Sequence, residues 1–314
     1  MDIGLSTHWN AYRHTDGRAL VDEIAALGFT SIELGYDTRL DLLPGIEAAV
    51  EAGAIQVHSL HAICPVPMGA PRGHPEIYTM ASTEKREREQ AVVYLQKTLD
   101  LAAALRAKAV VVHAGNVSMT RMSRELVDLA RNGQQFTARY ENLKFKLQEK
   151  REKKSRKQFG YLAECLAQIM PRLETNRVAL GLELLPSWES FPTEMELEYL
   201  LSQFPTRWFG AWIDIGHVQI RENLGFINLD RWMEKLGPRV VGMHLHDVVP
   251  PTTDHVMPPA GAVHFDRFEA LAQRDIPKVI EPAPRTPEIE IQKAHQHLLS
   301  CWKLTTTNQE QHDG

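Results

Sequence analysis

Residues 109–113 read AVVVH, an unbroken run of apolar, mostly β-branched side chains that ends at a histidine. Such a run is typical of a strand that is covered on both faces, with helices outside and packed side chains inside. His113 stands where this strand is expected to end. The stretch therefore predicts a buried parallel strand with an ionisable side chain at its end.

The same pattern recurs along the chain, with helical patterns between the runs. Eight strands are expected, at residues 3–6, 31–34, 55–60, 109–113, 178–183, 209–213, 240–245 and 278–281. Alternating strand and helix signals are typical of βα units, and eight such units close a (β/α)8 TIM barrel. We therefore predict an α/β protein with one TIM-barrel domain over residues 1–304 and a polar, disordered C-terminal tail over 305–314.

The interval between the fourth and fifth expected strands is the longest in the chain and predicts a helical insertion at about 116–158. A barrel of this type needs about 250 residues, which leaves room for such an insertion. Phe136, Tyr140, Leu143 and Leu147 recur at helical spacing and define one apolar face. Because no partner for this face is evident within the barrel, homo-oligomer formation through the insertion is a hypothesis.

Composition excludes several classes of protein. The 314 residues are 43% hydrophobic and 24% charged, which is typical of a globular chain, and no apolar run approaches the ~18 residues of a membrane span. The net charge of −5 does not favour a nucleic-acid partner. Residues 144–157 hold eight Lys or Arg against two Glu, and we expect a solvated helix face there, with a nucleic-acid-binding arm as the alternative. Three scattered cysteines and the absence of a signal-like N-terminus predict a cytoplasmic protein.

Ionisable side chains gather where the expected strands end. They are His61, His113, Glu183, Asp214 with His217 three residues later, His244 and Glu281. Strand ends of a closed parallel barrel meet at one rim, where crowded carboxylates and imidazoles need protons or a cation to compensate them. Glu183, Asp214, His244 and Glu281 supply three carboxylates and one imidazole, a set that suits Mn²⁺, Mg²⁺, Co²⁺ or Zn²⁺. A divalent metal is the expected cofactor.

Five blocks of sequence at these strand ends carry a resemblance to a known superfamily. They are VVHAG at 111–115, LEL at 182–184, IDIGH at 213–217, HLHD at 244–247 and IEP at 280–282. The chain resembles, over nearly its whole length, the xylose isomerase-like barrels. These include ketose 3-epimerases, inosose isomerases and dehydratases, and type IV apurinic endonucleases.

The epimerase branch implies that the four side chains named above hold one metal. It also implies that Glu183 and Glu281 are the acid/base pair and that His217 contacts substrate. The reaction implied is isomerisation or epimerisation of a small sugar or inositol-like polyol through a metal-stabilised enediolate. The epimerases have an arginine shortly after the strand-seven histidine, whereas residues 248–251 here read VVPP. Arg221 and Arg285 are the candidates to supply the missing cation from another loop.

Other side chains are expected near the substrate or behind it. His61 and His113, at strand ends, and Trp188, in the loop after strand five, are expected to contact the sugar. Glu33 ends the second strand, where we expect a structural hydrogen bond. By strand alternation His246 is expected to point away from its neighbours, behind the ligands.

The endonuclease branch implies a zinc phosphodiesterase of DNA repair with three ions. The strand-three and strand-four histidines would join Glu183 at one ion, and His217, Asp254 and His255 would hold another. The endonuclease motif separates its last Asp and His by one residue, whereas Asp254 and His255 are adjacent. This departure and the negative net charge favour sugar chemistry. A barrel that binds a metal or sugar without turnover is the remaining alternative.

Overall fold

The strands of the computed structural model, which describes residues 2–304, close into the predicted barrel. They are β1 (Gly4–Ser6), β2 (Ser31–Leu34), β3 (Gln56–His61), β4 (Ala109–Val112), β5 (Ala179–Glu183), β6 (Phe209–Asp214), β7 (Val240–Leu245) and β10 (Lys278–Ile280). Each strand pairs in parallel with its neighbours, and β1 pairs with both β2 and β10, which closes the ring. The TIM-barrel prediction is confirmed, whereas the tail expected at 305–314 lies outside the described residues.

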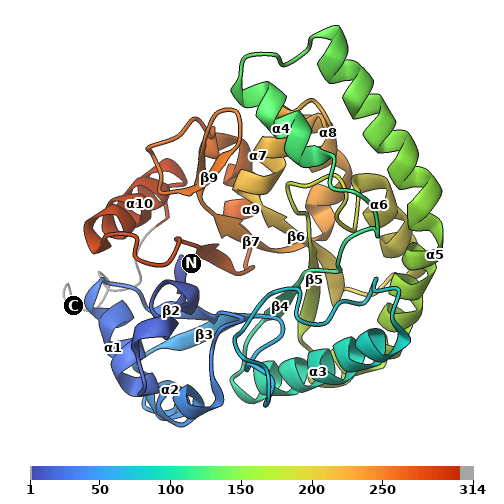
Figure 1. Ribbon diagram of the computed structural model, residues 1–314. Helices are drawn as coiled ribbons and strands as arrows, with labels where there is room; N and C mark the ends of the chain where they lie inside the picture. The colour runs from blue at the N-terminus through green and yellow to red at the C-terminus, as the bar shows by residue number, and fades with distance from the viewer. Residues whose placement is uncertain (1, 305–314) are drawn as a thin grey trace.

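Helices surround this ring, as Figure 1 shows in a view along the barrel. They are α1 (Gly17–Ala26), α2 (Leu43–Glu51), α3 (Lys85–Ala104), α4 (Ser123–Arg131), α5 (Ala138–Asn176), α6 (Glu194–Gln203), α7 (Ile215–Asn223), α8 (Leu229–Leu236), α9 (Glu269–Ala272) and α10 (Glu288–Cys301). Short 3-10 turns occupy Thr7–Trp9, Ala11–Arg13, Leu40–Leu42, Gly237–Arg239 and Phe265–Phe268. Within the described residues, no helix has the length and apolarity needed to cross a membrane.

The main hydrophobic core joins the strands to the inner faces of the helices. Val110 of β4, Leu95 and Leu99 of α3 and Leu298 of α10 belong to it and are fully buried or nearly so. The apolar strand residues thus pack as their unbroken runs predict. A separate, smaller cluster with Ala109, Val111, Ala179 and Trp212 alternates with this core along the strands, and Trp212 packs against His244.

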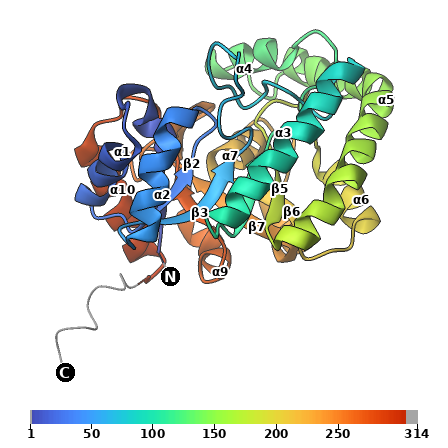
Figure 2. The ribbon, with the colours of Figure 1, turned by 90° about the horizontal axis from the view of Figure 1, so that it is seen from below.

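The helical insertion after β4 consists of α4 and the first part of α5. Figure 2 shows α4 across one end of the barrel, at the opposite end from α9. The second helix does not end near residue 158 as the sequence suggested. It continues without a break to Asn176, so that a single helix of 39 residues is both insertion and barrel helix.

The apolar face of the insertion is covered within the chain. Tyr140 is fully buried against Leu126 of α4, Ile220 of α7 and Leu224, which directly follows α7. Its hydroxyl donates a hydrogen bond to the carbonyl of Leu224 at 2.8 Å. Phe136 precedes α5 with a φ of 62° and is 64% exposed, so it does not extend this face. The insertion, which lies within the described residues, therefore has no uncovered apolar face of the kind that predicted a homo-oligomer, and the oligomeric state stays untested.

A two-stranded antiparallel hairpin follows β7 and was not expected from the sequence. It consists of β8 (Asp247–Val249) and β9 (Thr253–Val256). The carboxylate of Asp247 accepts backbone hydrogen bonds from Val248, Gly261 and Val263 at 2.8 to 2.9 Å. These bonds fix the loop that brings Asp254 and His255 to the rim.

Candidate metal centre and active site

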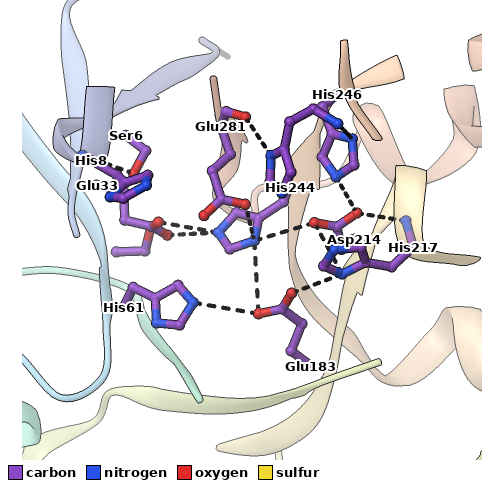
Figure 3. Close-up of polar contacts among 12 residues, drawn as sticks. Ser6, His8, Glu33, His61, Glu183, Asp214, His217, His244, His246 and Glu281 are labelled. Carbon is purple, nitrogen blue, oxygen red and sulfur yellow. Dashed lines mark hydrogen bonds and ion pairs between the residues drawn. The ribbon is translucent and has the colours of Figure 1, made fainter. Parts of the chain in front are cut away.

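The carboxyl ends of the strands bring the predicted side chains to one rim, because all strands of the barrel run in parallel. Asp214 and His244 are register partners on β6 and β7, and Glu281 follows the last residue of β10. Glu183 is the last residue of β5. Figure 3 shows these four side chains converging, and all four are buried.

The imidazole Nδ1 of His244 lies at the centre of this group. It is 3.4 Å from Glu281 Oε2, 3.8 Å from Asp214 Oδ2 and 3.9 Å from Glu183 Oε2. Neither this nitrogen nor Asp214 Oδ2 makes a hydrogen bond of acceptable geometry, although both atoms are buried. Buried polar atoms without partners are rare in folded proteins and mark places where a ligand or ion belongs. The donor set and these unpartnered atoms fit a divalent cation.

Glu33 holds the His244 ring from behind. Its two oxygens lie 3.1 and 3.2 Å from His244 Nε2, and Ser59 donates its hydroxyl to the same carboxylate at 2.8 Å. The expected structural hydrogen bond of Glu33 therefore has the metal-site histidine as its partner. A carboxylate on one ring nitrogen keeps the proton there and leaves the other nitrogen free to bind a metal. His244 Nδ1 is thus oriented as a ligand.

Glu183 also connects the central group to the two histidines at the ends of β3 and β4. His113 Nε2 lies 3.1 Å and His61 Nε2 3.5 Å from Glu183 Oε2. The other oxygen, Oε1, lies 3.2 Å from His217 Nδ1. His61, His113 and Glu183 form a second group whose spacing could hold a metal.

A third group consists of His217, His246 and His255. His246 Nε2 lies 2.8 Å from Asp214 Oδ1, whereas Asp214 Oδ2 is the oxygen near His244. Such a contact is the kind expected of a residue that lies behind the ligands, and the role of His246 stays a prediction. His255 donates its backbone N–H to His246 Nδ1, and the two rings stack at 4.2 Å.

The charges of the rim compensate one another. Burial alone would lower the pKa of His217, but the Asp214 and Glu183 carboxylates outweigh it and raise that pKa to about 9. Burial alone would raise the pKa of Glu183, yet the neighbouring histidines, His113 first, hold it well below its usual range. The carboxylates of the rim are therefore stabilised in their ionised form by neighbouring imidazoles, a role that a cation can also fill.

A cavity of about 390 Å³ opens above these groups. His61, His113 and His217, all expected near substrate, line it together with Glu183 and Glu281. This volume is at the lower end of ordinary ligand pockets and suits a small polar molecule.

Three other predicted residues lie elsewhere. Trp188 does not line the cavity and instead stacks on Phe226 with ring centroids 4.6 Å apart. Arg285 lines a separate open pocket beside Trp9. Asp254 lines the pocket next to the cavity, from which its charge helps to raise the pKa of His217.

A hydrogen-bonded row at the edge of the cavity includes Tyr36 and Asp37, which were not predicted as site residues, and His8, which follows the first strand and could be expected at the rim. Tyr36 and His8 line the cavity, with the Tyr36 hydroxyl 3.2 Å from His8 Nε2, and His8 Nδ1 lies 3.0 Å from Asp37 Oδ2. The sequence did contain a signal for this row. Like the other rim residues, His8, Tyr36 and Asp37 follow the ends of strands: His8 follows the first strand, and Tyr36 and Asp37 follow the second. This row gives the cavity a polar wall opposite β5 and β6.

Comparisons with known proteins agree with this architecture. A family model described as the xylose isomerase-like TIM barrel matches residues 21–301. No curated protein matches the chain in sequence. Among solved structures, a D-tagatose 3-epimerase-like protein superimposes with a TM-score of 0.67 and 17% identity, covering 96% of this chain and 98% of that one.

Two further similar structures are described as a sugar epimerase and as a protein with a bound zinc atom. The apo form of 3-keto-D-glucoside 4-epimerase from E. coli has a TM-score of 0.66 and 13% identity, covering 96% of this chain and all of that one. The IolI protein, described with a bound zinc atom, has a TM-score of 0.65 and 13% identity, covering 98% of this chain and all of that one. Identities this low show a shared fold alone.

Proposed function

The chain belongs to the xylose isomerase-like TIM barrel family, and from this premise we propose that it is a metal-dependent isomerase or epimerase of a small sugar or inositol-like polyol. One observation supports this most strongly: Glu183 and Glu281 both line the cavity, and both reach the same ring nitrogen of His244. Figure 3 shows them approaching that nitrogen from opposite sides. Similar structures described as sugar epimerases and as zinc-containing agree with the proposal.

Glu183, Asp214, His244 and Glu281 would hold the cation, which can be Mn²⁺, Mg²⁺, Co²⁺ or Zn²⁺. A divalent ion bound there would polarise the carbonyl group of the substrate and favour loss of a proton from the adjacent carbon. His61, His113 and His217 line the same cavity and would donate or accept hydrogen bonds with the hydroxyl groups of a polyol.

The two glutamates would move the proton. The pKa of Glu281, like that of Glu183, is below its usual value, because His244 and His255 outweigh the effect of burial, so both side chains are bases at neutral pH. In epimerisation one carboxylate takes a proton from the carbon next to the carbonyl, and the other glutamate, after taking up a proton from solvent, delivers it to the opposite face of that carbon. In isomerisation the first glutamate delivers the proton it has taken to the former carbonyl carbon, while the hydroxyl proton of the neighbouring carbon moves to the former carbonyl oxygen.

The experiment is proton exchange with solvent. The full-length protein with each of the four metals is incubated in D₂O with a panel of ketoses and inososes, and deuterium at the substrate carbon is measured by NMR. Glu281→Gln should lower exchange by about 10²-fold or more while polyol binding is retained, because the proton acceptor is lost; since Glu281 is also a proposed metal ligand, bound metal is measured in the same samples and exchange is compared at equal metal content. Glu234→Gln, an exposed change on α8, should leave exchange unchanged. Absence of exchange with every sugar and metal would contradict an isomerase and favour a barrel that binds without turnover.

A zinc phosphodiesterase is the second candidate because the rim holds several adjacent groups with metal-ligand spacing. Such an enzyme would bind about three zinc ions per chain, whereas a sugar isomerase built on the four central ligands would bind one. Elemental analysis after zinc loading and dialysis distinguishes the two. Cleavage of DNA at abasic sites, together with three bound zinc ions, would favour the phosphodiesterase.

A further inference from the structure

A second pocket opens beside the central cavity, and we propose that it binds the phosphate group of a phosphorylated polyol. It has a volume of about 420 Å³ and is lined by three arginines, Arg121, Arg124 and Arg131, with Thr252 and Asp254 on the facing hairpin. That the phosphate is attached to a polyol rests on the proposed function. The new element is that the substrate is phosphorylated. We call this the arginine pocket.

The arginine pocket is continuous with the central cavity. Arg121, Pro186 and Ser187 line both spaces. One small molecule can therefore have its reacting carbons beside the central carboxylates and its other end among the arginines.

The charge of the arginine pocket favours an anion. Its three guanidinium groups face two carboxylates, those of Asp128 and Asp254, which leaves an excess of one positive charge. In the part of the chain that the structure describes, α4 makes one ion pair, between Glu125 and Arg139, and neither side chain lines the pocket. Among the described residues, Arg121 and Arg124 have no ion-pair partner and Arg131 donates only to Thr252, so charged donors remain for a ligand.

Buried contacts hold the pocket wall in place. Glu189 is almost fully buried and accepts hydrogen bonds from the Ser123 backbone N–H at 2.9 Å and the Ser187 hydroxyl at 2.7 Å. It thereby ties the first residue of α4 to the loop that separates the two spaces. Arg221, fully buried, donates to the carbonyls of Leu185 at 2.6 Å and Ser187 at 3.3 Å in the same loop. The arginines are therefore presented from a fixed wall.

A phosphate group fits this pocket better than a hydroxyl group. A phosphate monoester has a charge of about −1.5 to −2 at neutral pH and three acceptor oxygens. Guanidinium groups bind such oxygens through paired, charge-assisted hydrogen bonds. Arg131 is already oriented, since its Nε donates to Thr252 Oγ1 at 2.9 Å and its Nη2 to the Thr252 carbonyl at 3.4 Å, which leaves Nη1 for a ligand.

The test is the binding of inorganic phosphate to the full-length protein, with and without metal, by isothermal titration calorimetry. The double variant Arg121→Gln/Arg124→Gln should raise the Kd for phosphate at least tenfold in both states, because two charged donors are lost. Arg139→Gln, a matched change of an exposed arginine outside the pocket, should leave it unchanged. Phosphate binding that survives in the double variant, or that occurs only with metal, would overturn the proposal.

A second measurement separates this proposal from the isomerase. Deuterium exchange is compared for a ketose phosphate, the free ketose and the corresponding sugar acid. The ketose phosphate should be preferred by at least tenfold in kcat/KM, and the double variant should remove that preference. Equal rates for the phosphate and the free ketose, or a preference for the sugar acid, would overturn the phosphate assignment and leave the isomerase standing. Arginine-dependent phosphate binding without exchange on any sugar would support the pocket and overturn the isomerase.

Discussion

Replacing Glu33 with Gln tests whether the residue behind His244 prepares it to bind a metal. Glu33 is fully buried, and its two oxygens lie 3.1 and 3.2 Å from His244 Nε2. Glutamine has the same shape, and its amide oxygen can still accept the Nε2 hydrogen bond while its amide nitrogen donates to Ser59. The substitution thus removes the negative charge without leaving the imidazole unpartnered.

The expected effect is a weaker metal site in a protein that stays folded. Loss of a carboxylate that orients a ligand histidine typically lowers metal affinity 10- to 100-fold. That range corresponds to about 1.4 to 2.8 kcal/mol. Glu33→Ala would be a poorer test, because removing one partner of a buried ion pair costs about 3 to 5 kcal/mol and would unfold part of the sample.

The assay is competition for Zn²⁺ against a chelating dye, with the thermal midpoint of the metal-free protein measured in parallel. Glu234→Gln on the exposed face of α8 is the matched control and should bind zinc as the unsubstituted protein does. Ser59→Ala removes one hydrogen bond to Glu33 and should give a smaller loss of affinity. A zinc Kd in Glu33→Gln within threefold of the unsubstituted value would refute the idea that Glu33 prepares His244.

Three further outcomes are expected. The pKa of His217 is raised from 6.5 to about 9, so the stability it adds to the metal-free protein is complete below pH 6.5 and lost as pH rises through 9. Metal affinity should rise as the pH rises from 6.5 to 9, because a bound cation displaces the proton of His217. Calorimetry in buffers of different ionisation enthalpy should detect the released proton. A metal affinity that falls as the pH rises would contradict this. Gly216→Ala would place a Cβ 2.0 Å from the ring of His246 and should destabilise the protein by about 1 to 3 kcal/mol in urea, although alanine usually stabilises a helix. Tyr140→Phe should lower the free energy of unfolding in urea by about 1 kcal/mol, because the hydrogen bond to the Leu224 carbonyl is lost. It should leave the oligomeric state, measured as the particle mass in solution, unchanged.

The barrel could be predicted because each buried strand has a local signature. The run Ala109–Val112 is apolar throughout and is followed by His113, and the structure ends β4 at that boundary. The same signature located Glu183, Asp214 and Glu281. Their convergence follows from the topology, since parallel strand ends in a closed barrel meet at one rim.

Other features depend on contacts between distant residues and had no local signature. The loop residue Trp188 was expected beside the sugar, but its partner is Phe226, 38 positions later. The partner of His246, Asp214, lies 32 positions earlier in the chain, so that contact also had no local signature. The apolar stripe of α5 lacked an evident partner only because α4 could not be placed over it from sequence.

Anomalous diffraction from crystals of the zinc-loaded, full-length protein would test the metal centre most directly. We predict a peak within about 2.0 to 2.2 Å of His244 Nδ1 and of one oxygen each from Glu183, Asp214 and Glu281. A principal zinc peak that lacks either glutamate as a ligand, or that lies away from this rim, would contradict the proposed centre.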